Sequence, residues 1–205
     1  MVAMFRNITL LGLLFGLAGC SGSANVMQDS ASQTIGKPDA NTAQIVFMRT
    51  SFVAGAITAE LFDVTGGNIK FIGALPTGDK ITYKTSPGKK VFMAYGTAAD
   101  FMLADVVAGK TYYSIVRPNW GTGGFAPTPV RNDGSTDYNT AIPVFSDWVS
   151  DTTLIQTKPG DAEKWFNANK LKIAEVYKEY WARFNTKSAH EKAARTLLPM
   201  DGVSR

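Results

Sequence analysis

Residues 57–75 read ITAELFDVTGGNIKFIGAL, two short runs rich in β-branched and aromatic residues on either side of Gly66-Gly67-Asn68. Glycine and asparagine adopt the positive φ that tight hairpin turns require, so apolar runs joined in this way are typical of a β-hairpin. The segment therefore predicts two antiparallel strands. The same pattern recurs on both sides of it.

Further strand-like runs follow at a spacing of about ten residues, mostly separated by turn-forming pairs such as Pro87-Gly88 and Ala108-Gly109. They occupy Ala43–Arg49 and residues 80–85, 89–97, 101–107 and 111–117. Within residues 80–85, apolar Ile81 and Tyr83 alternate with polar neighbours, as expected for a sheet with one solvated face. About seven such strands predict an antiparallel β-sandwich of the immunoglobulin or prealbumin-like type.

The segment after Pro118 departs from this rhythm. It contains a glycine-rich stretch, a proline-containing apolar run at residues 125–130 and a polar loop at 131–140. Residues 141–148 are interpreted as one more strand, at an edge of the sheet because Pro143 cannot donate a ladder hydrogen bond.

The last third of the chain is helical in pattern. Pro159-Gly160 ends the preceding segment, and Asp161 is a plausible N-cap. One face then carries apolar residues three or four positions apart, namely Phe166, Ile173, Tyr177, Tyr180 and Phe184. Ser188 and Glu191 match a capping box, which starts a short second helix ending near Leu198-Pro199.

The aromatic stripe is expected to pack on the β domain. The alternative is a helix that binds a membrane surface or a partner, which would carry lysine and arginine beside its apolar face. Acidic residues are instead mixed with lysines on the polar side of this helix.

The first twenty residues, MVAMFRNITLLGLLFGLAGC, are typical of an export signal, with Arg6 before an apolar stretch at residues 8–17 that is too short to span a bilayer. Leu17, Ala18, Gly19 and Cys20 resemble the lipobox that bacterial lipoprotein signal peptidase recognises. The resemblance implies that Cys20, the only cysteine, becomes the lipidated N-terminus. The other interpretation is an ordinary secretory signal beside an unpaired thiol.

The lipobox is followed by Ser21, which by the same resemblance implies the outer membrane. Residues 21–42 are polar and lack apolar periodicity, so they predict a flexible tether that would hold the domain about 25 Å from the membrane. The expected organisation is a signal peptide (1–19), a lipidated tether (20–42), a β-sandwich (43–148) and a helical extension (149–205) that packs on it.

Composition and motifs exclude several classes of function. A net charge of +4 without a basic run does not favour nucleic acid binding. Gly109-Lys110-Thr111 resembles the end of a phosphate-binding loop, but Ala104 stands where the first glycine would be, and a strand-like run follows instead of a helix. No nucleotide, metal or other cofactor is expected.

Catalytic residues are not apparent either. His190 is the single histidine, and there is no Gly-x-Ser-x-Gly elbow to present a serine to it. Glycosidase chemistry needs only two carboxylates, but the available acids, Asp63, Asp79, Asp100 and Asp105, form no marked pair.

One stretch is a candidate binding surface. Two aromatic residues flank a glycine-rich loop there, so the loop could be the rim of a contact site. The candidate residues are Trp120, Gly121, Gly123, Gly124 and Phe125. The alternative interpretation is a plain flexible loop between strands.

Three stretches resemble the small lipoproteins grouped as DUF2846-like. Ala43–Arg49 (AQIVFMR) is similar to the opening strand of that group, residues 85–89 (TSPGK) to its Pro-Gly turn, and residues 108–113 (AGKTYY) to the start of a later strand. The likeness covers about residues 43–118. It implies a β-sandwich and carries no catalytic residues.

These observations favour a non-enzymatic, lipid-anchored outer-membrane protein on the periplasmic side. Its membrane contact would be the N-terminal lipid, and its β-sandwich would be a binding or structural module for a partner protein or an envelope component. The alternative is an envelope hydrolase or cell-wall modifier that uses paired carboxylates. The oligomeric state is left open.

Overall fold

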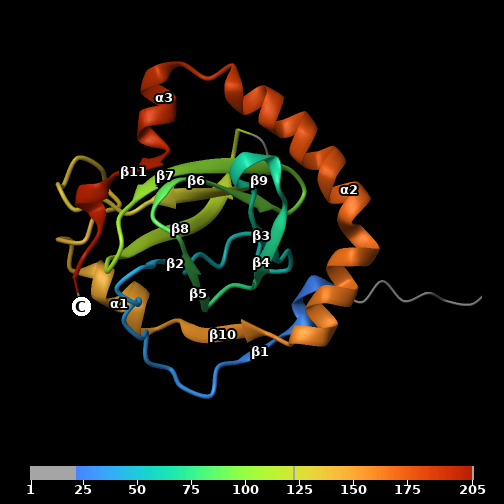
Figure 1. Ribbon diagram of the computed structural model, residues 1–205, viewed down its shortest axis with the longest axis horizontal. Coiled ribbons are helices and arrows are strands. Elements are labelled where there is room, and N and C mark those ends of the chain that lie inside the picture. The colour runs from blue at the N-terminus through green and yellow to red at the C-terminus, as the bar shows by residue number, and fades with distance from the viewer. Residues whose placement is uncertain (1–21, 122, 205) are drawn as a thin grey trace, which may run out of the picture.

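The computed structural model describes residues 22–121 and 123–204, which form two β-sheets with one long helix along the outside (Figure 1). The strands are β1 (Met27–Asp29), β2 (Ala43–Arg49), β3 (Ala59–Asp63), β4 (Lys70–Leu75), β5 (Asp79–Thr85), β6 (Gly88–Tyr95), β7 (Ala99–Val106), β8 (Thr111–Asn119), β9 (Gly124–Pro129), β10 (Thr153–Thr157) and β11 (Thr196–Leu197). The α-helices are α1 (Val144–Ser150), α2 (Pro159–Asn185) and α3 (Ala189–Ala194), and the 3₁₀ turns are η1 (Ser23–Val26), η2 (Thr65–Gly67) and η3 (Pro199–Asp201).

The two sheets are mixed. One has the order β1-β10-β5-β2-β8-β9 and the other β11-β7-β6-β3-β4. The pairs β2–β8, β10–β5 and β11–β7 are parallel, and the remaining pairs are antiparallel. The expectation of a mainly β fold with C-terminal helices is confirmed. The expectation of a purely antiparallel sandwich is wrong, because strands distant in sequence lie in parallel.

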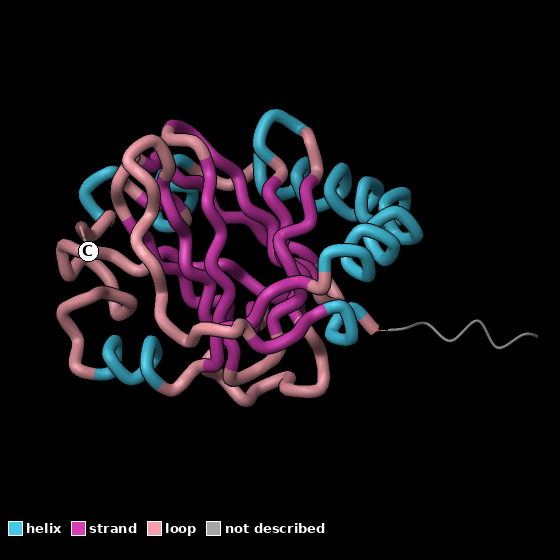
Figure 2. The backbone as a smooth tube through the Cα atoms, turned by 60° about the horizontal axis from the view of Figure 1, so that its bottom comes forward, coloured by secondary structure: helices cyan, strands magenta, loops and turns pink. Residues whose placement is uncertain are grey.

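The core lies between the two sheets. Side chains from β2, such as Ile45 and Phe47, meet side chains from β6 and β7, and the rings of Phe47 and Phe92 are 5.3 Å apart. Burying this apolar surface is the main source of stability for such a fold. Figure 2 shows the strands gathered in the centre with helices at the periphery.

The outer faces of the sheets are also covered. On the five-stranded sheet, α2 packs its aromatic stripe on Phe62, Met93 and Phe101, so the expected docking of this helix on the β domain is observed. On the six-stranded sheet, Val46 and Met48 are buried against α1 and nearby loops. β2 is consequently buried at all seven positions, whereas β5, on which the expectation of a solvated face was based, exposes Lys84.

Two local expectations are corrected at the C-terminal side. Residues 141–148 contribute no edge strand, since α1 begins directly after Pro143, and Phe145 and Trp148 pack from it onto the sheet. The long helix starts at Pro159 rather than after Asp161, because proline fits the first turn of a helix. The Ser188–Glu191 capping box is confirmed, and it begins α3.

The described part of the expected tether is not free. Residues 27–29 form β1, which pairs antiparallel with β10, and Val26, Met27 and Ile35 are buried. Gln44 donates to the carbonyl oxygen of Gly36 at 2.9 Å, which fixes the chain just before β2. The segment from residue 22 onward is therefore part of the domain.

Candidate functional site

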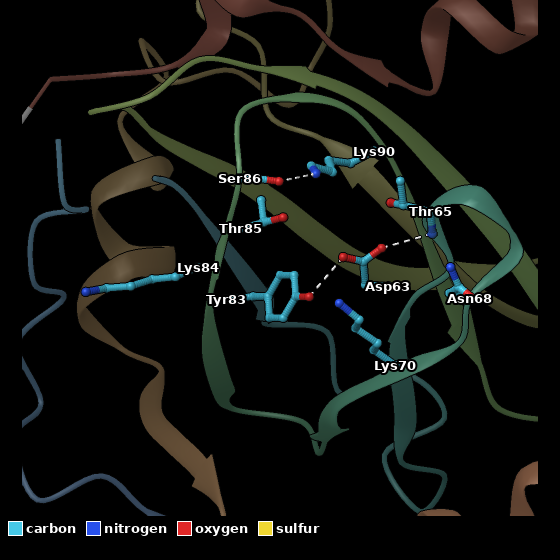
Figure 3. A pocket seen from close by; sticks show the side chains of 9 residues that line it. All are labelled: Asp63, Thr65, Asn68, Lys70, Tyr83, Lys84, Thr85, Ser86 and Lys90. Carbon is cyan, nitrogen blue, oxygen red and sulfur yellow. Dashed lines mark hydrogen bonds between the residues drawn. The ribbon is translucent and has the colours of Figure 1, made fainter. Parts of the chain in front are cut away.

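A polar pocket of about 350 Å³ opens at one end of the two sheets, beside η2 (Figure 3). It lies where the β3–β4 connection meets the turn between β5 and β6. The lining residues are polar or charged throughout, and they are Asp63, Thr65, Asn68, Lys70, Tyr83, Lys84, Thr85, Ser86 and Lys90.

A hydrogen-bonded pair, the buried Asp63 and the half-buried Tyr83, forms the floor of the pocket. The Tyr83 hydroxyl donates to one Asp63 carboxylate oxygen at 2.9 Å, and the Thr65 amide donates to the other at 2.9 Å. Asp63 is only 6% exposed. Burial, together with the negative charge of Asp63, raises the pKa of Tyr83, so its hydroxyl stays protonated and keeps donating.

Lysine side chains surround this floor. Lys90 donates to the Ser86 hydroxyl at 2.8 Å, and Lys70 extends toward Tyr83 (Figure 3). Lys84 points away from the other lining residues, and its ammonium lies 3.0 Å from Asp39. Two ammonium groups, Lys70 and Lys90, therefore face the pocket with a single carboxylate below them.

The topology explains why these residues meet. Asp63 ends β3 and Lys70 begins β4, while Thr85 ends β5 and Lys90 lies in the first half of β6, so all four lie at the same end of the two sheets. The sequence analysis missed this pocket. The available signal was the recurrence of lysine beside turns, but the sequence does not show which turns share an end.

In the structure, some residues of the candidate surface predicted from sequence are exposed and others are buried. Trp120 is 81% exposed, and Gly121 and Gly123 are exposed beside it. Gly124 is buried, and a Cβ there would collide with the carbonyl of Ala98. Phe125 is buried as well, with the Arg49 guanidinium 4.3 Å from its ring centre, so it belongs to the core and not to a surface.

Trp120 instead lines a shallow hollow of about 220 Å³ with residues from other elements. Tyr138 and Trp148 contribute aromatic rings, and the Arg117 guanidinium lies 5.4 Å from the Tyr138 ring centre. The other lining residues are Thr50, Ser51, Val53, Ile115 and Pro118.

Two of the acids considered from sequence, Asp63 and Asp100, have structural partners. Asp100 accepts from Arg195 at 2.9 Å and from Asn119 at 2.7 Å. Glu60 is a different case, since burial raises its pKa and it lines an open hollow near Gly22. No second acid lines that hollow within the described residues, and the described chain holds no cluster of three or more metal-ligating side chains.

The lipobox residues Leu17, Ala18, Gly19 and Cys20 lie outside the described residues. Among the helices that the structure does describe, none is long and apolar enough to cross a bilayer. Comparison with known proteins gives no match to this chain among family models, curated proteins or solved structures.

Proposed function

We propose that the chain is a lipid-anchored protein of the cell envelope that acts as a non-enzymatic binding module, and that the pocket at Asp63 and Tyr83 binds an acidic saccharide of the envelope. The observation that carries the proposal is the placement of Lys70 and Lys90 around this pocket. Two ammonium groups provide charge for a carboxylate or phosphate on the ligand.

The remaining lining residues fit the rest of a sugar. Thr65, Thr85 and Ser86 carry hydroxyls and Asn68 carries an amide, all of which can exchange hydrogen bonds with ligand hydroxyls. The volume of about 350 Å³ lies at the lower end of the range for small-molecule sites. That size suits one or two sugar rings better than a folded partner.

The pocket supports binding rather than hydrolysis. Glycoside hydrolysis uses two carboxylates on opposite sides of the scissile bond. Asp63 is the one acid among the described lining residues, and both of its oxygens already accept hydrogen bonds. The hydrolase alternative would need a second acid at this site.

The anchor rests on the sequence. Leu17-Ala18-Gly19-Cys20 resembles a lipobox, the likeness to DUF2846-like lipoproteins points to the same class, and Ser21 by the same resemblance points to the outer membrane. Lipidation at Cys20 would give the domain its membrane contact, since two or more acyl chains hold a protein stably at a bilayer.

The ligand class can be tested by nuclear magnetic resonance titration with glucuronate, glucose 6-phosphate and neutral glucose as probes. Saturable shift changes at Thr65, Asn68 and Ser86 with the two anionic probes, and weaker ones with glucose, are expected. Replacing Lys70 and Lys90 together by Gln should abolish the difference between anionic and neutral probes. Lys178→Gln, on the exposed side of α2, is the matched control. Equal responses to all three probes would contradict an acidic ligand.

The anchor has a separate test. Cells that express the chain are labelled with palmitate, and the membranes are separated from soluble protein. Wild-type protein should carry the label and sediment with membranes. The Cys20→Ser variant should carry no label and should not be processed as a lipoprotein. Labelling that persists in the Cys20→Ser variant would defeat the assignment of Cys20.

A further inference from the structure

Large apolar side chains are exposed together at the end of the sandwich opposite the lysine pocket. Phe52 is 86% exposed, Trp120 81%, Val53 44% and Ile57 36%. Single exposed apolar residues are common on proteins, but several on adjacent loops indicate a contact surface.

The topology places these loops at one end. β2 and β8 are parallel neighbours, so the loop after Arg49 and the loop after Asn119 leave the same edge of the sheet. Thr77 donates to the carbonyl of Ser51 at 3.2 Å, and Thr97 donates to the carbonyl of Gly123. These bonds join the β4–β5 and β6–β7 connections to the same group of loops.

No charged residue occurs in any of these loops. The sequences are TSFVAGAIT at residues 50–58, PTG at 76–78, GTA at 96–98 and PNWGTG at 118–123. By contrast, the opposite end carries Lys70, Lys84 and Lys90. The two ends of the sandwich therefore differ in polarity.

The chain that leads to Cys20 enters the domain at the apolar end. Gly22, Ser23 and Ala24 line an open hollow together with Ala56 and Ile57. Gly22 is the first described residue, and its neighbours in the sequence, residues 22–26, are also uncharged. The point of entry and the exposed apolar side chains are thus adjacent.

The largest of these loops is held in a defined shape. Arg49, buried at its base, donates to the carbonyl oxygens of Ala54 at 2.8 Å and Ile57 at 2.6 Å. Ala54 adopts a positive φ of 56°, which is unfavourable for alanine and is maintained by these bonds. A loop fixed in this way presents Phe52 and Val53 without a further ordering cost.

We propose that this end, defined by Phe52, Val53, Ile57 and Trp120, rests on the surface of a lipid bilayer. The inference depends on the proposed anchor at Cys20, because the anchor brings this end to the membrane. Tryptophan and phenylalanine partition into the headgroup region of bilayers, and uncharged loops avoid the penalty of burying charge there. Charged side chains also border this end: Glu60 lines the hollow beside Gly22 and Ile57, and Arg117 lines the hollow beside Trp120. The Lys172 ammonium lies 5.6 Å from the ring centre of Tyr95, directly before the 96–98 loop.

The test uses the lipidated full-length protein reconstituted into phosphatidylcholine–phosphatidylglycerol vesicles whose acyl chains carry bromine near the headgroup. Bromine quenches tryptophan emission only at contact distance, and Trp120 is one of four tryptophans. If Trp120 lies at the interface, bromine is expected to quench about a quarter of the total tryptophan emission. Trp120→Phe should abolish this quenching. Phe52→Ser combined with Val53→Ser should reduce the quenching at least twofold.

Val107→Ser is the matched control, because Val107 is 38% exposed and follows Val106, which pairs with Gly88 at the opposite end of the sheets. It should leave the quenching unchanged. Protein that sediments with vesicles while Trp120 is not quenched would overturn the proposed contact but leave the anchor intact. Protein that lacks the acyl chains by mass spectrometry would instead refute the anchor. A dimer detected by light scattering, with Trp120 protected in it and not quenched by lipid, would also overturn the proposal.

Discussion

The guanidinium of Arg49 lies 4.3 Å from the centre of the Phe125 ring, at the end of the core between the two sheets. Arg49 has no exposed surface, and burial lowers its pKa to about 10, which leaves it charged at neutral pH. Its charge is balanced by three carbonyl oxygens, those of Ala54, Ile57 and Leu75, and by the face of the ring. One side chain thus joins the 50–58 loop to the β8–β9 hairpin.

Arg49→Met is expected to destabilise the fold by about 3 kcal/mol, because three carbonyl oxygens, the buried one of Leu75 among them, lose their donor at once. Urea unfolding measures the loss. Arg183→Met is the control, since Arg183 also lies over an aromatic ring, that of Tyr180, but on the exposed surface of α2. Its cost should stay below about 1 kcal/mol. Equal losses in both variants would show that the buried bonds of Arg49 add nothing.

Tyr83→Phe should lower the free energy of unfolding by about 1–2 kcal/mol at pH 7, since the buried Asp63 loses one of its two donors while the ring contact with Phe92 stays. The raised pKa of Tyr83 gives this difference a pH dependence. An unfolded tyrosine ionises near pH 10, so the contribution is complete below about pH 10 and is lost as the pH rises further. Urea titrations from pH 7 to 11 measure the difference in unfolding free energy between wild type and Tyr83→Phe. A difference that grows above pH 10 would contradict the raised pKa of Tyr83.

Glu60→Gln should stabilise the protein at pH 7 relative to wild type. Burial raises the pKa of Glu60, so the folded state holds its proton more tightly than the unfolded state, and the charged form is disfavoured by folding. This cost is absent below the unfolded value near pH 4 and complete once the pH exceeds the raised value. In thermal unfolding, the stability that Glu60→Gln gains over wild type should therefore develop as the pH rises from the unfolded pKa to the raised pKa of the folded state.

Asp201→Asn should destabilise the fold by about 3 kcal/mol, because it leaves the buried Arg131 without its countercharge. Arg131 donates to Asp201 at 2.9 Å, and the two side chains are 7% and 0% exposed. The same carboxylate accepts from the amides of Asn132 and Leu198, so it fixes the C-terminal segment to the residues after β9. Calorimetry compares it with Asp39→Asn, in which the exposed pair with Lys84 is broken. A similar small change in both would rule out a structural role for the buried pair.

The sequence predicted most strands within two residues, because short alternating runs between turn residues are a local signal. The prediction failed at residues 141–148, although Phe145, Trp148 and Val149 already have the spacing of a helix face. Pro143 was interpreted as a strand-edge residue, whereas it immediately precedes the first turn of α1. Proline is compatible with both settings, so composition alone could not decide.

The pairing of strands that lie far apart in the chain could not be predicted from the sequence. β1 has three residues, and its partner β10 lies more than a hundred positions away, so nothing local distinguishes it from a polar linker. The pocket was missed for the same reason, since Tyr83 and Asp63 come from different sheets. Phe125 was predicted at a surface because it flanks a glycine-rich loop together with Trp120, but its ring is buried under the guanidinium of Arg49, which is distant in sequence.

The pairing of β1 with β10 also restricts how the domain can be oriented. With Met27 fixed opposite Thr157, two residues of chain separate Cys20 from Gly22, and two residues span at most about 7 Å. A lipidated Cys20 would then allow the domain to rotate about the membrane normal, but it would not allow the opposite end of the domain to reach the membrane. The lysine pocket, about seven strand residues or roughly 23 Å away, would always face away from the bilayer. Only ligands that reach that height above the membrane would be captured.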